Sequence, residues 1–456
     1  MNFSRVFVAN RGEIAVRVLR ACRALGLETV IGVSDADRHS SGARLADRVV
    51  VLGPAPSKDS YLNPNLIVAA AMGSGCNALH PGYGFLSERA ELADLCSESD
   101  IAFVGPTADT IRQVGDKISA RELAQAANVP LVPGTGEVTT VEAAKSAAND
   151  LEYPVVLKAT AGGGGRGMAV ARSDEDIAKN FDAASLEAEE AFGDGTLYVE
   201  RFVENARHVE IQILGDGNGA ILHFGDRDCS AQRRYQKVVE EAPATAVPND
   251  IREDMRAAAV RLAESINYRN AGTVEFLYDQ NRNAFYFIEV NARIQVEHPV
   301  TEEITGVDLV AQQLKIAAGE PLSLTQDMIN LSGHAIECRI NAEMPGRDFA
   351  PSPGQITAWL PPVGDGIRID SHCEQGYTVP PYYDSMIGKL IVHGTTRAQA
   401  ISRMRGALAD FRIDGIHTNT HLQAFLVGHQ DFKNNKIDTR WLERTLLPAY
   451  TKVMGV

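Results

Sequence analysis

The chain has 456 residues, 45% hydrophobic and 23% charged, which is the composition of an ordinary globular protein with room for several lobes. Its 44 lysines and arginines against 59 aspartates and glutamates give a formal net charge of −15, which argues against nonspecific binding to nucleic acid. The sequence shows neither a signal peptide nor an apolar run that could span a bilayer, so we expect a cytoplasmic protein with no membrane partner.

The first part of the chain, residues 1–115, alternates short apolar runs with helical stretches. Val6–Ala9 predicts a strand, Glu13–Leu25 a helix and Thr29–Val33 a second strand. This order is typical of a parallel α/β domain. No glycine-rich dinucleotide fingerprint follows the first strand, so we assign no cofactor to this domain.

The cysteines indicate neither a zinc ribbon nor a disulfide framework, because no two of them have a C-x-x-C spacing. Reduced thiols in a cytosolic protein are the simplest interpretation. We therefore expect small packing residues at all six positions, which are Cys22, Cys76, Cys96, Cys229, Cys338 and Cys373.

A predicted strand that ends in a lysine, Tyr153–Lys158, leads into a segment with four consecutive glycines, Ala161–Met168. The backbone N–H groups of such a loop can approach a phosphate closely, and a glycine run can act as the hinge of a lid. The pattern matches neither common glycine-rich nucleotide motif, and a flexible hairpin tip is the alternative. Lys158 and Lys117 favour a mobile lid over a triphosphate, spanning about residues 130–203.

Two runs rich in aromatic and β-branched residues, Gly272–Asp279 and the run from Phe285, flank a short polar turn and predict a β-hairpin. If Asp279 pairs with Phe285, the register places Glu275 directly opposite Glu289. Like charges in that position repel each other, and a divalent cation between them would remove the repulsion.

Asn291 adds a neutral oxygen to this predicted pair of carboxylates. Oxygen ligands of this kind favour Mg²⁺ or Mn²⁺ over zinc. Because Mg²⁺ commonly completes its shell with substrate phosphates, we expect a nucleotide nearby. The sequence thus predicts a metal site made by Glu275, Glu289 and Asn291.

From Glu289 to Glu297 every second residue is polar, and the residues between them are apolar. In an extended strand successive side chains point to opposite faces, so one face would carry Glu, Asn, Arg, Gln and Glu in a row. Such a row suits a metal–phosphate site followed by an anion site. A half-buried edge strand with a solvated face is the alternative.

Five long motifs resemble those of the biotin carboxylases of the ATP-grasp superfamily. They are Val8–Ala15, His80–Glu88, Lys158–Met168, Glu289–Glu302 and Pro380–Leu390. The resemblance covers essentially the whole chain. It implies an α/β fold, α+β overall: an ATP-grasp fold with a Rossmann-like N-terminal lobe (1–115), an ATP-grasp domain (116–330) that includes the mobile glycine-loop lid, and a C-terminal closing subdomain (331–456).

The resemblance also implies roles for single positions. Positions that resemble contacts of ATP, or lie beside the nucleotide in the family, are Lys117, Lys158, Gly164, Gly165, Glu200, Arg201, Phe202, Val203, His208, Gln232 and Tyr235. Positions that resemble the metal ligands are Glu275, Glu289 and Asn291. Positions that resemble the bicarbonate site are Lys237, Arg293, Gln295 and Val296. Glu297 resembles the general base, and Arg339 resembles the residue that contacts biotin.

The implied reaction uses ATP, bicarbonate and Mg²⁺ or Mn²⁺ to carboxylate biotin through carboxyphosphate. Glu297 would deprotonate bicarbonate, and Arg339 would stabilise the enolate-like oxygen of biotin. Because the chain has no Met-Lys-Met biotin-attachment sequence, we expect a free-standing subunit with a separate biotin carboxyl carrier protein and a carboxyltransferase partner. The final acceptor is not written in this chain: we expect the biotin carboxylase component of an acetyl-CoA or related carboxylase, with a propionyl-CoA, pyruvate or other biotin-dependent carboxylase as the alternative.

Two features depart from the family pattern. Tyr235 stands where family members usually carry histidine, and tyrosine cannot be cationic at neutral pH. A homodimer is expected at positions that correspond to Arg20, Ala24, Asp365 and Arg368, yet some relatives have Glu and Phe in place of Ala24 and Asp365.

Two rival hypotheses remain at this stage. One is another ATP-grasp ligase, acting on an amino acid or a purine intermediate. The other is a nucleotide-sensing regulatory subunit without turnover. The Arg-x-Gln-x-Glu-His-Pro continuation after Asn291 argues against the first, and the complete set of charged site residues argues against the second.

Overall fold

The computed structural model describes residues 2–159, 168–192 and 195–455. The chain forms two compact units. The first comprises Met1–Val129, Arg207–Phe276 and Ile288–Val456, and the second comprises Pro130–Ala206 and Leu277–Phe287. The segment predicted as a lid, residues 130–203, belongs to the second unit, together with the tip of the predicted hairpin.

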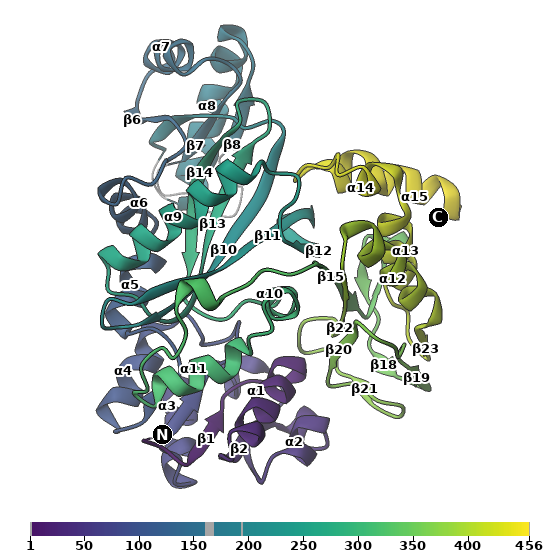
Figure 1. Ribbon diagram of the computed structural model, residues 1–456. Coiled ribbons are helices and arrows are strands. Elements are labelled where there is room, and N and C mark those ends of the chain that lie inside the picture. The colour runs from purple at the N-terminus through teal and green to yellow at the C-terminus, as the bar shows by residue number, and fades with distance from the viewer. Residues whose placement is uncertain (1, 160–167, 193–194, 456) are drawn as a thin grey trace. The chain divides into compact units, whose positions relative to one another are not determined.

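A five-stranded parallel sheet opens the first unit (Figure 1), in the order β3-β2-β1-β4-β5. Its strands are β1 (Arg5–Val8), β2 (Glu28–Ser34), β3 (Arg48–Gly53), β4 (Ala78–His80) and β5 (Ala102–Phe103). The helices of this region are α1 (Gly12–Ala24), α2 (Ser41–Leu45), α3 (Pro64–Gly73), α4 (Ala90–Glu98) and α5 (Ala108–Gly115). Parallel strands need such crossover connections, and the predicted strand–helix–strand start is confirmed.

An eight-stranded sheet, also in the first unit for most of its length, carries most of the predicted site residues. Its order is β14-β13-β10-β11-β12-β15-β22-β20. The strands are β10 (Ala206–Asp216), β11 (Ile221–Arg233), β12 (Gln236–Ala242), β13 (Arg269–Asp279), β14 (Ala284–Asn291), β15 (His334–Asn341), β20 (Ile367–Ser371) and β22 (Met386–Gly394). The helices of this region are α6 (Lys117–Ala126), α9 (Asn249–Ser265), α10 (His298–Thr305) and α11 (Leu309–Ala317).

The predicted hairpin is present, since β13 and β14 are neighbours in this sheet. Its turn places Asn283 in the left-handed region at φ 51°, which asparagine tolerates. Asp279 Oδ1 accepts a hydrogen bond from the backbone N–H of Asn281 at 2.9 Å and so closes the turn. The direct pairing of Glu275 with Glu289 stays a prediction.

The predicted extended strand from Glu289 to Glu297 is wrong beyond Asn291. β14 ends there, the chain turns, and α10 begins at His298. Pro299 favours the start of α10, because its fixed φ suits the first turn of a helix.

The part of the eight-stranded sheet that follows α10 in the chain has an apolar face and a charged face. On β15, Ile336, Cys338 and Ile340 are part of an apolar core that also contains residues of α12 (Arg397–Asp410) and α13 (Thr420–Gly428). Glu337 and Arg339 alternate with them and therefore point to the opposite face. That opposite face packs against α10, and β22 also contacts α1. One face is thus a hydrophobic core, and the other can hold charges.

Short elements complete the C-terminal part of the first unit. They are β16 (Glu343–Met344) with β17 (Ala350–Pro351), β18 (Gly354–Gln355) with β21 (Thr378–Val379), β19 (Ala358–Leu360) with β23 (Arg412–Asp414), and the helices α14 (Gln430–Lys433) and α15 (Leu447–Met454).

The second unit contains a four-stranded antiparallel sheet, in the order β6-β9-β7-β8, with two helices. Its elements are β6 (Gly134–Val138), α7 (Val141–Leu151), β7 (Val155–Ala159), β8 (Met168–Ala171), α8 (Asp174–Phe192) and β9 (Leu197–Arg201). The predicted phosphate loop with Gly164 and Gly165 lies outside the described residues.

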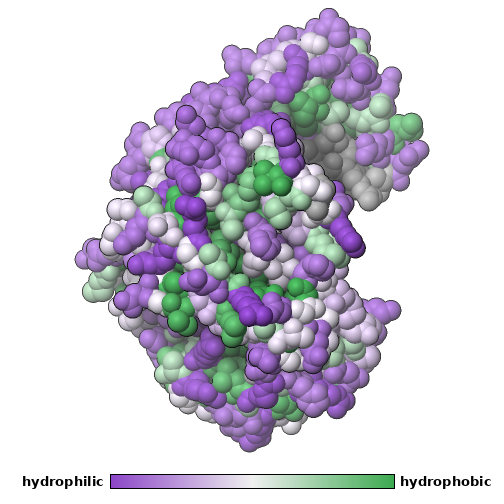
Figure 2. Space-filling model, turned by 90° about the vertical axis from the view of Figure 1, so that its right-hand side faces the viewer, coloured by the Kyte–Doolittle hydropathy of each residue, from purple (hydrophilic) through white to green (hydrophobic). Residues whose placement is uncertain are grey.

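The face drawn in Figure 2 is largely hydrophilic, with hydrophobic residues in small scattered groups. None of the helices in the described part of the chain combines the length and apolar character needed to cross a membrane. All six cysteines are buried and free, in agreement with the prediction of unpaired packing residues.

Candidate active site

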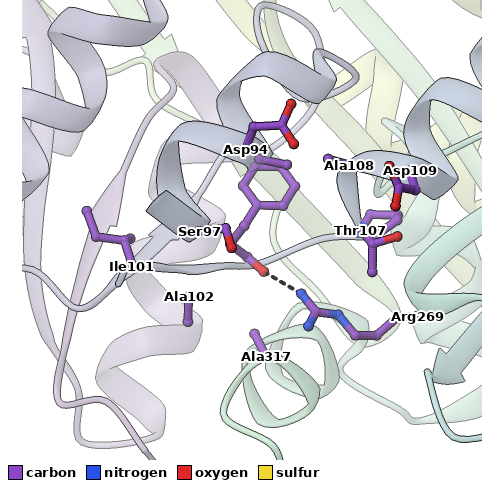
Figure 3. A pocket seen from close by; sticks show the side chains of 12 residues that line it. Asp94, Ser97, Ile101, Ala102, Thr107, Ala108, Asp109, Arg269 and Ala317 are labelled. Carbon is purple, nitrogen blue, oxygen red and sulfur yellow. Dashed lines mark hydrogen bonds between the residues drawn. The ribbon is translucent and has the colours of Figure 1, made fainter. Parts of the chain in front are cut away.

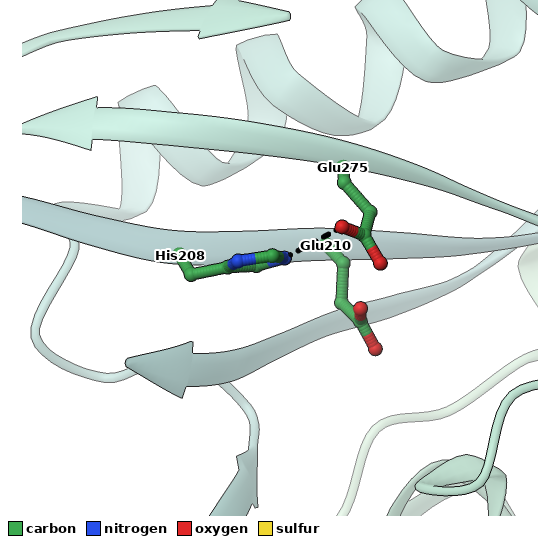
Figure 4. Close-up of side chains that lie close together, drawn as sticks. All are labelled: His208, Glu210 and Glu275. Atoms are coloured by element: carbon green, nitrogen blue, oxygen red, sulfur yellow. Dashed lines mark ion pairs between the residues drawn. The ribbon is translucent and has the colours of Figure 1, made fainter. Parts of the chain in front are cut away.

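Three ionisable side chains meet where β10 and β13 lie side by side (Figure 4). His208 and Glu210 are two residues apart on β10 and so share a face of the sheet, and Glu275 comes from β13. His208 Nε2 lies 2.9 Å from Glu275 Oε2. Burial disfavours the charged form of His208, but the charge of Glu275, its hydrogen bond to His208 and the charge of Glu210 together raise the pKa of His208.

Lys237, on β12, stands at the centre of a larger cluster. Its Nζ lies 2.6 Å from Glu210 Oε2, 2.9 Å from Glu275 Oε1 and 2.6 Å from Glu297 Oε1. Burial alone would lower the pKa of Lys237, but the surrounding carboxylates hold it well above its usual value. Lys237 is thus a permanent cation that three carboxylates share.

Glu297 is fully buried, yet it is held ionised. Its Oε1 contacts Lys237, and its Oε2 accepts a hydrogen bond from Arg339 at 3.0 Å. Burial opposes ionisation, but Lys237, Arg339 and Arg227 together bring the pKa of Glu297 well below its usual value. Arg339 also donates from Nε to Glu240 Oε1 at 2.6 Å, so its guanidinium bridges two carboxylates.

Arg293 connects the end of β14 to the segment after it. It donates to Asn291 Oδ1 at 2.7 Å, to Gln295 Oε1 at 2.7 Å and to Glu88 Oε2 at 2.9 Å. Gln295 in turn donates from Nε2 to Glu275 Oε1 at 3.1 Å. The polar residues predicted to share one face of a strand therefore do come together, although the strand itself has ended.

The predicted metal ligands have a donor set that fits a hard divalent cation. Glu289 is exposed, but desolvation by the protein around it and the negative charge of Glu275 both raise its pKa. Carboxylate oxygens and the Asn291 amide oxygen are typical Mg²⁺ ligands. Such a cation would compete with Lys237 and His208 for Glu275, and with Arg293 for Asn291.

Of the predicted ATP-contacting residues, several belong to the second unit. Lys158 on β7 forms an ion pair with Glu200 on the adjacent strand β9, and the Lys158 side chain keeps 29% of its surface exposed. Arg201 donates from Nε to the Leu151 carbonyl at 3.0 Å. The backbone N–H of Phe202 donates to Pro154 O at 2.9 Å, and the Val203 side chain is buried with Ala206 and Tyr286.

The remaining nucleotide-site predictions fall in the first unit. Lys117 is exposed at the start of α6, where Asp116 caps the helix through the N–H of Ser119 at 2.8 Å. Gln232 is buried and donates to the Cys229 carbonyl at 3.0 Å. Tyr235 is 78% exposed at the tip of the β11–β12 hairpin.

Sequence reasoning missed several charged residues of this site. Glu210 lies two positions after His208 and shares its face of β10, but no strand was predicted there, so the two residues were not connected from the sequence. Arg227 is fully buried on β11 and pairs with Glu210, while donating to Gln212 and Thr301 at 2.8 and 2.9 Å. No sequence pattern indicated that Glu240 belongs to the site, because only the pairing of β12 with β15 brings it to Arg339.

A separate cavity of about 340 Å³ lies in the first unit, lined by residues of α4, α5 and their surroundings (Figure 3). Arg269 reaches into it and donates to the carbonyls of Phe103 and Gly105, both at 3.2 Å. The lining carboxylates Asp94 and Asp109 are both paired with Arg112. None of the predicted site residues lines this cavity, so it is not part of the candidate active site.

Family models match almost the whole chain in three consecutive pieces. Residues 2–111 match the biotin carboxylase N-terminal domain, residues 116–325 match the ATP-binding domain of the carbamoyl-phosphate synthase L chain, and residues 337–444 match the biotin carboxylase C-terminal domain.

Two relatives in sequence cover nearly the full length. The chain is 51% identical to biotin carboxylase 1 of Bacillus subtilis over 440 residues, which is 96% of this chain and 98% of the relative. It is 46% identical to a pyruvate carboxylase subunit of Methanothermobacter thermautotrophicus over 443 residues, 97% of this chain and 90% of the relative.

Solved structures give the same picture. The biotin carboxylase domain of a thermophilic 2-oxoglutarate carboxylase bound to bicarbonate superposes with a TM-score of 0.93 at 44% identity, covering 98% of this chain and 99% of that one. The corresponding dimer from Hydrogenobacter thermophilus, in complex with MgADP, ADP and bicarbonate, gives 0.88 at 46% identity with the same coverage. The fold class predicted from the sequence is therefore confirmed.

Proposed function

Because this chain belongs to the biotin carboxylase family, we propose that it carboxylates biotin on a separate carrier protein, using ATP and bicarbonate. The observation that carries the proposal is the buried, ionised Glu297, which lies between Lys237 and Arg339. A carboxylate held in that form between two cations is suited to accept a proton from an anionic substrate. The relative that superposes best among those described above is bound to bicarbonate.

The first step is the activation of bicarbonate. Lys237, Arg293, Gln295 and Val296 are the proposed binding residues, and Glu297 is the proposed base. When the bicarbonate anion takes up part of the positive charge of Lys237, Glu297 loses some of its stabilisation. The pKa of Glu297 then rises towards the range of a useful base. The contact that holds Glu297 ionised in the free enzyme is thus the one that the substrate weakens.

The second step is phosphoryl transfer from ATP to the deprotonated bicarbonate oxygen, which gives carboxyphosphate and ADP. Catalysis of this step rests on positioning and on neutralising negative charge. Lys117, Lys158 and His208 supply cationic or donor groups for the phosphates, and Gly164, Gly165 and the Glu200–Val203 segment complete the proposed nucleotide site. Glu275, Glu289 and Asn291 would hold Mg²⁺ or Mn²⁺, which would supply Lewis-acid chemistry to this step.

The third step transfers the carboxyl group. Carboxyphosphate breaks into CO₂ and phosphate, the phosphate takes the proton from the ureido nitrogen of biotin, and that nitrogen attacks CO₂. Arg339 stabilises the negative charge that develops on the ureido oxygen. Its guanidinium cannot lose its proton, and the pKa of Arg339 is raised further because Glu240 and Glu297 outweigh its burial.

The organisation of the chain is proposed to follow the same family. We propose an N-terminal domain of residues 1–115, an ATP-grasp domain of residues 116–330 and a C-terminal domain of residues 331–456, in line with the three family matches. The lid is proposed at residues 130–203, within the ATP-grasp domain. We infer a homodimer, since a relative is described as a dimer, and a carboxyltransferase as a further partner. The free, buried cysteines support a cytoplasmic location.

The chain is proposed to serve an acetyl-CoA or related carboxylase, with propionyl-CoA, pyruvate or another substrate as the alternative final acceptor. Relatives of similar identity carry the names of biotin carboxylase, pyruvate carboxylase and 2-oxoglutarate carboxylase components. Because biotin is carboxylated before the acceptor is met, the partner carboxyltransferase selects the acceptor.

The test is ADP release by the purified chain with MgATP and bicarbonate, with and without biotin. Biotin-stimulated ADP release that disappears in Glu297→Gln is the expected result. Glu241→Gln is the matched control, because Glu241 is another buried glutamate that pairs with Arg397 and His334, outside the site. ATP turnover without any response to free or carrier-bound biotin would indicate a different ligase, and no turnover at all would indicate a nucleotide sensor.

A further inference from the structure

Lys389 is a buried cation that the reaction steps above do not use. It lies on β22, within the motif Pro380–Leu390, and its side chain has no exposed surface. Its Nζ donates to the backbone carbonyl of Val296 at 2.8 Å and lies 3.0 Å from Glu13 Oε1. Glu13 comes from α1, within the motif Val8–Ala15, so two motifs without an assigned role meet at this ammonium group.

The sheet register places Lys389 beside the biotin-contacting residue. Lys389 is directly opposite Arg339 on β15 and opposite Asp370 on β20. Residues directly opposite each other in an antiparallel pair have their side chains on the same face. Lys389, Arg339 and Asp370 therefore form one row of charges on the face that α10 covers.

A buried lysine of this kind is costly and must be compensated. Burial lowers the pKa of Lys389, but Glu13, Glu337 and Asp370 together raise it, so the side chain stays charged. An apolar side chain of similar size would avoid this desolvation cost and often gives equal stability. An apolar residue could neither neutralise Glu13 nor donate a hydrogen bond to the Val296 carbonyl, and the ammonium group does both.

The acceptor of that hydrogen bond is significant, because the carbonyl of Val296 belongs to the peptide that leads directly into Glu297. This peptide lies between the end of β14 and the start of α10, where no sheet ladder fixes it. Arg293 and Gln295 hold the beginning of the segment, and Lys389 holds its end.

We propose that Lys389 is a positioning residue for the base Glu297, which it fixes through the Val296 carbonyl, with Glu13 as the counterion that fixes the ammonium group. This role rests on the proposed function and adds a residue to it. Lys389 does not touch substrate. It sets the distance of the Glu297 carboxylate from the bicarbonate site and from Arg339.

The main experiment compares Lys389→Met with the wild type in biotin-stimulated ADP release. We expect kcat to fall about 100-fold, because a displacement of about 1 Å at a reacting group costs that much. The KM for ATP should stay within about twofold, since nucleotide contacts are not involved. Arg397→Met is the matched control. It removes another partly buried cation that donates to backbone carbonyls and pairs with Glu241.

A double-mutant cycle separates positioning from general stability. If Lys389 acts through Glu297, then Lys389→Met should reduce the residual activity of Glu297→Gln by less than about threefold. A full 100-fold loss in both backgrounds would overturn the proposal, and so would an equal loss of kcat in Arg397→Met at matched melting temperature. If Lys389→Met does not fold, Glu13→Gln/Lys389→Met replaces it, because that variant removes the cation together with a carboxylate that it neutralises.

The activity of the wild type separates a failure of the proposed function from a failure of the proposed role of Lys389. A wild type without biotin-stimulated ADP release would overturn the proposed function itself. An active wild type with a Lys389→Met variant of equal kcat would leave the proposed function intact and overturn only the role of Lys389.

Discussion

Two strand lysines, one in each unit, show how differently a protein can hold the same side chain. Lys237 is 12% exposed and contacts three carboxylates, each of which has a further cationic or donor partner. Lys158 is 29% exposed, and among the described residues its ion pair is with Glu200 alone. The first lysine is fixed from several sides in a desolvated cluster, whereas the second can exchange its partner for another anion at low cost.

This difference indicates a division of labour. Groups that handle protons must keep their geometry before the substrate arrives, because preorganised charges stabilise a transition state without reorganisation. Groups that capture a phosphate gain from being accessible. The proposed bicarbonate site is accordingly buried among mutually paired charges, and the proposed phosphate lysine remains partly open to solvent.

The largest effect is expected from Glu297→Gln, which removes the proposed base from the fixed cluster. General base catalysis contributes roughly 10²- to 10⁴-fold, so kcat for biotin-stimulated ADP release should fall by about that factor. Glutamine keeps the shape, and a thermal melt should show a folded protein that binds ATP as the wild type does. Retention of more than about a tenth of the activity would show that another group takes the proton.

Replacing each lysine by methionine tests the comparison directly. Lys237→Met leaves Glu210, Glu275 and Glu297 without their shared cation and should cost about 3–5 kcal/mol of unfolding free energy. Lys158→Met removes the lysine partner of one carboxylate, Glu200, and should cost about 1–3 kcal/mol of unfolding free energy. Its main effect should be on the KM for ATP. Urea unfolding measures both free energies. Equal losses of stability in the two variants would contradict the idea that only Lys237 is fixed from several sides.

Glu240 accepts a hydrogen bond from Arg339, as Glu297 does, and gives the fixed cluster a pH-dependent stability. Burial outweighs the attraction of Arg339 and raises the pKa of Glu240 from 4.5 to about 7. Below about pH 4.5 the group is protonated in both states and contributes nothing. As the pH rises from 4.5 to 7, the Glu240 carboxyl group loses its proton in the unfolded state before it does so in the folded state. The free energy of unfolding therefore falls by on the order of 3 kcal/mol over this range.

Glu240→Gln should remove that loss, so that the difference in unfolding free energy between variant and wild type grows in favour of the variant between pH 4.5 and 7. Urea titrations at several pH values measure it. A constant difference across this range would show that Glu240 is already ionised in the folded state.

The smallest effect is expected at Tyr235. Arg234 and Tyr235 have φ angles of 47° and 64°, which are unusual for side chains of this type. Histidine is enriched at such left-handed positions, so Tyr235→His should stabilise the protein by up to about 1 kcal/mol. Any nucleotide role of this position would appear as a changed KM for ATP. An unchanged KM would argue that Tyr235 lies outside the nucleotide site.

The sequence alone was enough for the local pattern of the site. Two runs rich in aromatic and β-branched residues around a polar turn predicted the β13–β14 hairpin, which is present, whereas the direct pairing of Glu275 with Glu289 stays a prediction. The alternation predicted from Glu289 to Glu297 failed after Asn291, where β14 ends, and side-chain contacts replace the ladder before α10 begins at His298. Glu240 and Lys389 could not be predicted as neighbours of the site, because their partners come from distant parts of the chain and no local period records such contacts.

The second unit is built from two separate stretches of chain, and this has a practical consequence for dissecting the protein. Leu277–Phe287 contributes Tyr286 to the small cluster with Val203 and Ala206, and the N–H of Phe287 donates to Pro130 O at 2.7 Å. A recombinant fragment of residues 130–206 would lack this stretch and expose the apolar surface that it covers. Protease trimming that aims to isolate the unit must therefore recover two peptides, held together without a covalent link.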